Sequence, residues 1–227
     1  MTGPLSVFIM GAGRMGEILA KSMAGNHMVT IYDHDEQKGR MVAERAGCRY
    51  GKPADILPST EVVVLALPPA VTAPALASVH QFLRPDAVVI NIATTVFKDA
   101  LRPLLGGSGH LAGAKIVGHY REMNEKPAVL VDADTEKAGQ AAFLLFSDVG
   151  RVEPGDERLV QLINTLATGE AFRAAVRIED QLREAGVSPG LINSALRVVA
   201  AGSIKSYAEG DIGPFARELL KEIRSSS

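Results

Sequence analysis

The chain has 227 residues, enough for one substantial domain and a smaller one. With 47% hydrophobic and 22% charged residues it is typical of a globular protein, and its net charge of −2 gives no general attraction to nucleic acid or an anionic membrane. Its single cysteine, Cys48, excludes an internal disulfide, and no His/Cys spacing indicates a metal site. The first apolar run is too short for a signal peptide, so we expect a cytoplasmic protein without membrane or nucleic-acid partners.

The first part of the chain has the pattern of a strand, a glycine-rich turn, a helix and a second strand. Apolar runs cover residues 5–10 and 28–32, and the second run stops at Asp33. This order is typical of a dinucleotide-binding βαβ unit, in which glycines make the tight turn and let a pyrophosphate approach the helix N-terminus. The predicted cofactor-binding residues of this turn are Gly11, Ala12, Gly13, Arg14, Met15 and Gly16.

Asp33 bears on the choice of cofactor. It lies 22 residues after Gly11, where a carboxylate can accept hydrogen bonds from both ribose hydroxyls. A 2′-phosphate at this place would meet a like charge, which favours NAD(H) over NADP(H). Positive charge is available from His34, Lys38 and Arg40, so both cofactors stay open, with NAD(H) favoured.

Strand and helix patterns then alternate as far as residue 153. Expected strands are 61–67, 87–93, 115–118, 128–131 and 150–153, and expected helices are 36–46, 71–83 and 135–146. The strands near residues 64 and 90 are continuous apolar runs, as in strands buried on both faces. The pattern predicts an α/β fold with a Rossmann-type, doubly wound, mostly parallel sheet in a dinucleotide-binding domain over residues 1–153.

Residues 154–227 show helical patterns only. We expect helices from residue 156, over about 170–185, over 189–207 and over 214–223, with a break between the first two at residues 168–170. About 70 residues of helix are marginal for independent stability. This small domain is therefore expected to complete its core against the first domain or a second copy of itself.

Several segments, taken in order, resemble those of pyrroline-5-carboxylate reductases. They are Leu65-Ala66-Leu67-Pro68-Pro69, Asn91-Ile92-Ala93, residues 121–128, Thr168-Gly169-Glu170-Ala171-Phe172 and residues 178–187. The resemblance implies a helical domain that forms a homodimer by intertwining, and an active site between two subunits. It also implies nicotinamide contacts at Leu67 and Pro68, with Asn91 ending the next strand.

Two features depart from that family. Its Ser-Pro-Gly-Gly-Thr-Thr signature, which holds the substrate carboxylate, is lacking after residue 219. Glu170 replaces a proline and adds negative charge near the same place, which would repel an anionic imino acid. We therefore expect a small-molecule substrate with a positive group, or one that needs a proton.

Catalytic candidates lie in two segments. His119 and Asn124, with Tyr120 and Arg121 between them, follow an expected strand and could bind an acid and deliver a proton; the alternative is a solvated loop with one capping interaction. Thr168 and Glu170 lie at the expected helix break, where Glu170 is a candidate proton donor or ammonium anchor. The alternative for this pair is a helix N-cap.

These observations favour an NAD(P)-dependent oxidoreductase that reduces a C=N or C=O bond in a small imine, amino or oxo acid. An alternative is a nucleotide-binding regulatory or accessory protein without turnover. A third possibility is a deazaflavin-linked NADP reductase, which would favour basic residues after the second strand, where Asp33 stands.

Overall fold

The computed structural model describes residues 3–106 and 109–225. The chain divides into two compact units, an N-terminal unit of residues 1–164 and a C-terminal unit of residues 165–227. The boundary expected after residue 153 falls at the end of the last strand. Among the described residues, no helix is long and apolar enough to cross a membrane.

The described part of the N-terminal unit holds one eight-stranded sheet, in the order β3-β2-β1-β4-β5-β6-β7-β8. Its strands are β1 (Ser6–Met10), β2 (Met28–Tyr32), β3 (Arg49–Tyr50), β4 (Val62–Leu65), β5 (Val88–Asn91), β6 (His110–Val117), β7 (Ala128–Ala133) and β8 (Arg151–Pro154). Neighbouring strands are parallel except β6 and β7, whose short connection leaves no room for a crossover helix. The predicted doubly wound, mostly parallel sheet is confirmed.

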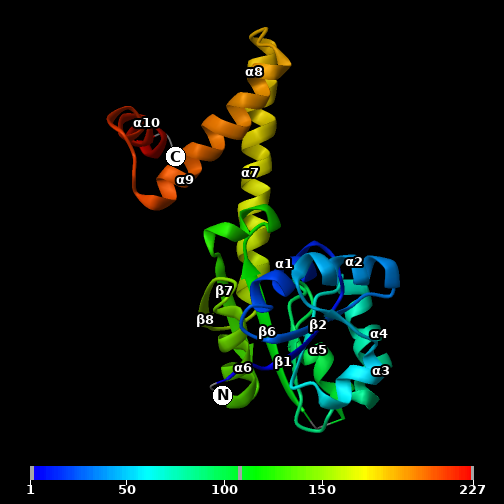
Figure 1. Cartoon of the computed structure of the whole chain (residues 1–227). Helices are drawn as coiled ribbons and strands as arrows, with labels where there is room; N and C mark the ends of the chain where they lie inside the picture. The colour runs from blue at the N-terminus through cyan, green and yellow to red at the C-terminus, as the bar shows by residue number, and fades with distance from the viewer. Residues whose placement is uncertain (1–2, 107–108, 226–227) are drawn as a thin grey trace. The chain divides into compact units, whose positions relative to one another are not determined.

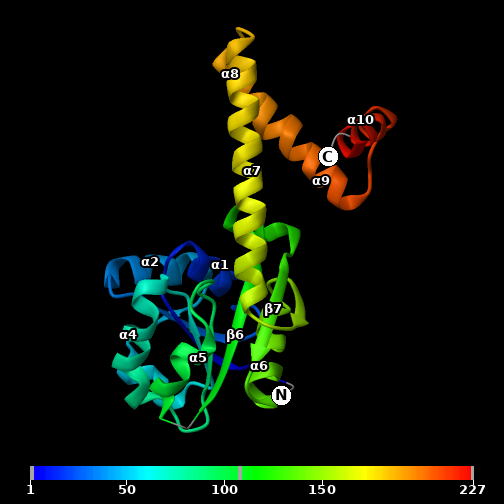
Figure 2. The same ribbon diagram turned by 180° about the vertical axis from the view of Figure 1, so that it is seen from behind.

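Helices cover both faces of the sheet. One hydrophobic cluster joins the sheet to three helices that are labelled in Figure 1: α1 (Arg14–Met23), α2 (Glu36–Ala46) and α6 (Glu136–Phe146). The second joins it to α3 (Pro53–Ile56), α4 (Pro69–Val79) and α5 (Lys98–Leu101), with α4 and α5 in front in Figure 2. Strands β4 and β5 are buried at every residue, which explains their uninterrupted apolar sequences.

The helix ends follow from local chemistry. The Asp35 side chain accepts a hydrogen bond from the Lys38 amide and begins α2, and Gly47, with φ +67°, ends it in the left-handed conformation. The Thr135 side chain caps α6 in the same way as Asp35 caps α2. The Asp35 cap starts α2 shortly after β2, at the edge of the sheet where the candidate site lies.

The described chain after β8 is helical, as predicted. Its elements are α7 (Arg158–Glu184), α8 (Pro189–Ser194), a π-helical stretch (Ala195–Ala200), α9 (Ala201–Glu209) and α10 (Pro214–Ser225). The predicted break at residues 168–170 is wrong, because α7 continues through it. One interior glycine costs a helix about 1 kcal/mol. An ion pair between Glu170 and Arg173, one turn apart, supports the helix at this point.

Candidate functional site

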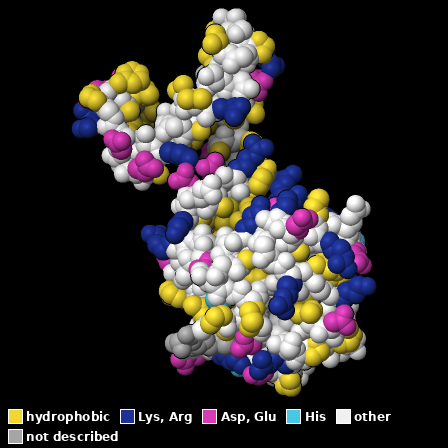
Figure 3. Space-filling view, viewed as in Figure 1, with side chains coloured by type: hydrophobic (Ala, Val, Ile, Leu, Met, Phe, Trp, Pro, Cys, Tyr) yellow, Lys and Arg dark blue, Asp and Glu magenta, His cyan; other side chains and the backbone are white. Residues whose placement is uncertain are grey.

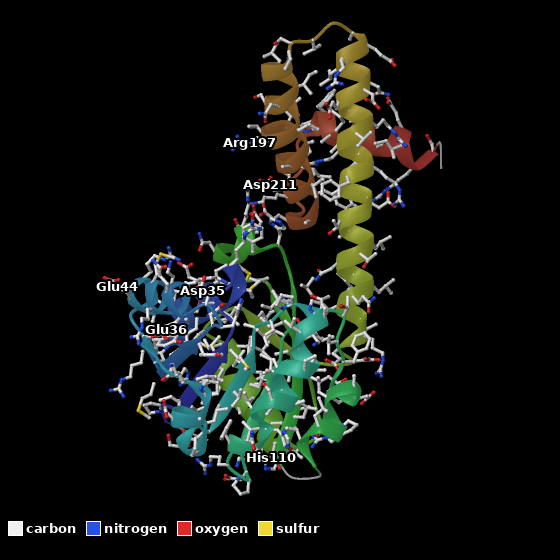
Figure 4. The ribbon with its side chains drawn as sticks, turned by 90° about the vertical axis from the view of Figure 1, so that its right-hand side faces the viewer. Asp35, Glu36, Glu44, His110, Arg197 and Asp211 are labelled. Atoms are coloured by element: carbon white, nitrogen blue, oxygen red, sulfur yellow. The ribbon has the colours of Figure 1, made fainter. Side chains whose placement is uncertain are left out.

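The predicted cofactor residues converge on the carboxyl-terminal edge of the sheet. Because β1, β2, β4 and β5 are parallel, the turns that follow them emerge at the same edge. Figure 4 shows Asp35 and Glu36, which follow β2, at the end of the N-terminal unit opposite to His110, which begins β6. The chain reverses its direction of progress between β1 and β4, and doubly wound sheets bind ligands at such a switch point.

The turn between β1 and α1 requires glycine at two positions for steric reasons. Gly11 has φ +111°, and a Cβ there would lie 2.3 Å from the Ala66 carbonyl oxygen, just beyond β4. A Cβ on Gly16 would lie 1.9 Å from the Gly11 carbonyl oxygen. Both distances are far inside van der Waals contact, so the turn fits only when these two side chains are absent.

Gly13 is different, because a Cβ at this position would meet no atom within 4 Å. It is the N-cap residue of α1, and no side chain caps the helix there. Amide groups of the first helical turn lack carbonyl partners within the helix, and they carry the positive end of the helix dipole. Open space beside free helix-start amides is the arrangement that can accept an anion such as a pyrophosphate.

Asp33 anchors the glycine-rich turn to the end of β2. Its carboxylate accepts a hydrogen bond from the Ala12 amide (2.8 Å) and one from Lys38 Nζ (3.1 Å), and only 6% of the residue is exposed. Burial alone would raise the pKa of Asp33, but these hydrogen bonds, with another from the Asp35 amide, hold the pKa below its ordinary value. Asp33 is therefore ionised at neutral pH.

A hollow of about 400 Å³ lies beside the end of β2. Its lining includes Tyr32, His34, Tyr50 and Lys52. The rings of Tyr32 and Tyr50 are 6.3 Å apart. Glu36 adds a carboxylate, so the lining mixes aromatic and aliphatic side chains with charged groups of both signs, which suits a planar, polar ring.

The turns after β4 and β5 lie next along the same edge. Leu67 borders the glycine-rich turn, since its Cδ2 would be 3.0 Å from a Cβ on Gly11, and Pro68 precedes α4. Asn91 is fully buried: its amide nitrogen donates to the Val96 carbonyl (2.6 Å), and its side-chain oxygen accepts from the Ala93 amide (3.0 Å). Asn91 thus shapes the loop after β5 from within.

The segment after β6 reaches the glycine-rich turn. The Arg14 guanidinium lies over the ring of Tyr120, 4.7 Å from its centroid, and the His119 ring is 4.5 Å from the same ring. His119 Nδ1 accepts a hydrogen bond from the Arg121 amide, which is the capping interaction weighed from the sequence. His119 and Asn124 are both exposed, so this segment adds accessible polar groups to the edge.

Thr168 and Glu170 belong to the C-terminal unit, in the interior of α7. Both residues are exposed, and Glu170 Oε1 lies 2.5 Å from the Arg173 guanidinium. The N-cap alternative is wrong for both residues, since no helix begins there. Their catalytic roles stay predictions.

Two features of the edge escaped prediction from sequence. The contact of Arg14 with Tyr120 joins residues far apart in the chain, and no local pattern indicates it. The buried pair of Lys115 and Glu157 lies under the loop after β5. Its only sequence signal is a lysine within the apolar run of β6.

A larger hollow, of about 650 Å³, lies at the opposite edge, among the amino ends of β1, β2 and β4. Cys48 is part of its lining, and burial raises the pKa of that thiol to about 11. The thiol is therefore protonated and a poor nucleophile at neutral pH.

Comparisons with known proteins agree with this geometry. Residues 6–95, which contain the glycine-rich turn, Asp33 and the ends of β4 and β5, match the family described as NADP oxidoreductase, coenzyme F420-dependent. A search of curated protein sequences gives no match.

The chain is similar to several solved structures. A pyrroline-5-carboxylate reductase from Coxiella burnetii has a TM-score of 0.77 at 15% identity, over 99% of this chain and 92% of that one. A putative oxidoreductase from Mycobacterium avium 104 gives 0.75 at 20% identity, over 97% and 86%. The Plasmodium falciparum pyrroline carboxylate reductase with NADP bound gives 0.68 at 14%, over 98% and 90%. The resemblance to pyrroline-5-carboxylate reductases is confirmed at the level of the fold.

Proposed function

We propose that the chain is an oxidoreductase that binds a nicotinamide dinucleotide and reduces a C=N or C=O bond of a small imine, amino or oxo acid. The observation that carries this proposal is the glycine-rich turn. Nearby backbone atoms leave no room for a side chain at Gly11 or Gly16. Gly13, in contrast, faces open space at the start of α1. The space left by the missing Cβ of Gly13 lies at the free amides of α1, where a pyrophosphate needs room to approach.

The residues at this edge of the sheet fit a dinucleotide whose adenosine half lies near β2 and whose nicotinamide half lies near β4 and β5. Gly13 and the first turn of α1 would hold the pyrophosphate, and Asp33 with the hollow beside it would hold the adenosine half. The nicotinamide half then extends toward β4 and β5, where Leu67 and Pro68 border it. Asn91 contributes through the shape of its loop. The bound nicotinamide supplies hydride chemistry, and the protein supplies position and charge.

Gly13→Val should abolish dinucleotide binding while leaving the fold intact. Apart from its chain neighbours, no protein atom lies within 4 Å of a Cβ there, so the added side chain costs little in the free protein but occupies the proposed pyrophosphate position. NADH fluorescence titration should show at least a tenfold rise in Kd. Gly25→Val, in the turn after α1 and equally unobstructed, is the matched control. Equal affinities for wild type and Gly13→Val would contradict the proposed site.

We propose NAD(H) as the preferred cofactor, because the ionised Asp33 would repel a 2′-phosphate. Lys38, at 3.1 Å, offsets part of that charge, so the preference should be modest. Asp33→Ala should raise the ratio of NADPH to NADH affinity about tenfold by removing the repulsion and freeing Lys38. The two Kd values can be measured by titration calorimetry.

Glu44→Ala is the control for this charge change. Glu44 is an exposed carboxylate on α2, the helix that also carries Lys38. It lies about 12 Å along the helix axis from Glu36, which begins α2 next to the proposed site. Its loss should leave the affinity ratio unchanged. A wild-type protein that binds NADPH clearly tighter than NADH would overturn the proposed preference.

The catalytic groups proposed are Glu170 and Thr168 of α7, with His119 and Asn124 after β6. Glu170 serves as proton donor or as anchor for a substrate ammonium group, in agreement with a substrate that carries or needs a proton. The other candidate, a binding protein without turnover, requires NADH binding without any oxidation of NADH. An assay of NADH oxidation with a panel of cyclic imines, amines with oxo acids, and oxo acids alone separates these two candidates. Oxidation with any of these substrates supports the enzyme.

Glu170→Gln should lower kcat about 100-fold if its carboxyl group transfers the proton. Glu179→Gln is the matched control, because Glu179 also pairs with an arginine one turn further along α7. Activity is followed by NADH absorbance with the best substrate of the panel. Unchanged kcat and KM in Glu170→Gln would leave His119 as the candidate donor.

The match to an F420-dependent family favours one further candidate, hydride transfer between NADP(H) and a deazaflavin. Asp33 opposes NADP(H) in the proposed site. The same assay decides between the two functions if coenzyme F420 is included as an acceptor.

We also propose that the C-terminal unit forms a homodimer. Among its described residues only Ile192 is buried, although many large apolar side chains are present. Figure 3 shows such side chains in yellow on the surface. The exposed ones include Phe172, Val176, Leu191, Val198, Val199, Ile204, Phe215 and Leu219. So much exposed apolar surface is typical of an interface.

Light scattering should therefore give twice the chain mass of 24.0 kDa at micromolar concentration. Phe172→Asp, in the C-terminal unit, should produce monomers. Phe143→Asp, an exposed phenylalanine of α6 in the N-terminal unit, should not. A wild-type monomer would contradict the proposed dimer.

A further inference from the structure

A buried ion pair lies under the loop that follows β5. Lys115, on β6, and Glu157, directly before α7, have side chains that are 0% and 1% exposed, and their charged atoms are 3.2 Å apart. Neither residue can touch a ligand directly. Burial lowers the pKa of Lys115, and the Glu157 carboxylate opposes this shift.

Lys115 holds the loop by its backbone. Its Nζ donates to the carbonyl oxygens of Ala93 (2.7 Å) and Val96 (2.8 Å), and to that of Asn91 (3.2 Å). The Asn91 side chain bonds to the same short stretch. One ammonium group thus fixes three carbonyls within six residues, and residues 94 and 95 lie between the fixed carbonyls of Ala93 and Val96.

Glu157 completes the anchor from the other side. Its Oε1 accepts a hydrogen bond from the Lys98 amide (2.5 Å), at the point where the loop enters α5. Gly113 makes room for this carboxylate, since a Cβ there would lie 1.8 Å from Glu157 Oε2. The sequence of β6 therefore provides both the lysine and the space for its counter-ion.

Stability alone does not account for a buried ion pair such as Lys115 and Glu157. Replacing a buried ion pair by apolar residues of similar volume is often neutral or stabilising, whereas removing one partner is strongly destabilising. What the pair supplies that apolar side chains do not is a set of directed hydrogen bonds to the loop backbone. A role in placing this loop accounts for the bonds, the burial and Gly113 together.

We infer that Lys115 and Glu157 are positioning residues for the nicotinamide half of the cofactor. This inference rests on the proposed function. Asp33, directly after β2, marks the adenosine side of the switch point, and the loop after β5 lies on the other side, beyond β4. The anchored loop would contact only the nicotinamide end of a dinucleotide that crosses the edge.

The test compares NADH with ADP-ribose, which has the adenosine and pyrophosphate but lacks the nicotinamide. The double variant Lys115→Met/Glu157→Met keeps the side-chain volume and leaves no unpaired charge. Its Kd for NADH should rise about tenfold, while its Kd for ADP-ribose stays within about twofold of wild type. Lys137→Met is the control, because Lys137 Nζ pairs with Asp86 and bonds to none of the three loop carbonyls.

Glu157→Gln is the second variant, should the double variant not fold. It keeps the shape of the side chain and removes the charge that balances Lys115, and it should weaken NADH binding alone. Equal losses for NADH and ADP-ribose, or no loss for either, would overturn the positioning role. A wild-type protein that binds neither ligand would instead overturn the proposed function, and this inference with it.

Discussion

The arrangement of the site depends on one steric constraint, the close approach of the turn after β1 to both β4 and α1. Gly11 passes the Ala66 carbonyl and Gly16 passes the Gly11 carbonyl at distances that no Cβ allows. This contact sets where α1 begins, and so where its free amides point. It also places Ala12 where its amide meets Asp33 at the end of β2. The open position of Gly13 is a consequence, because its neighbours on both sides are fixed.

Charge at this edge is organised in two layers. Asp33 bonds to the glycine-rich turn and to Lys38, so its carboxylate and the turn form one unit just at the edge. Lys115 and Glu157 lie below the surface, pair with each other and bond to the backbone of the loop after β5. A ligand that spans the edge would meet the first layer directly and the second only through the loop after β5. Changes in the two layers should therefore have separable effects on the two halves of a dinucleotide.

Much of the N-terminal unit could be predicted from sequence, because its signals are local. The glycine spacing, the apolar runs of β4 and β5 and the Gly47 stop each depend on a few adjacent residues, and each is confirmed. The strand predicted from residue 115 begins at His110, because small residues before Lys115 weaken the strand pattern while pairing with β5 extends the strand. The break expected at Gly169 was wrong for a related reason: one glycine is a weak signal against a long helix. Contacts between residues far apart in the chain, such as Arg14 with Tyr120, have no local sequence pattern from which they could be predicted.

The central claim is that the start of α1 holds a dinucleotide pyrophosphate, and a crystal structure of the chain with NADH tests it most directly. The account predicts the pyrophosphate within hydrogen-bond distance of the amides that follow Gly13, the adenosine ribose on Asp33, and the nicotinamide beside Leu67 and the loop after β5. A dinucleotide bound elsewhere, or a pyrophosphate out of reach of the α1 amides in a crystal saturated with NADH, would contradict it.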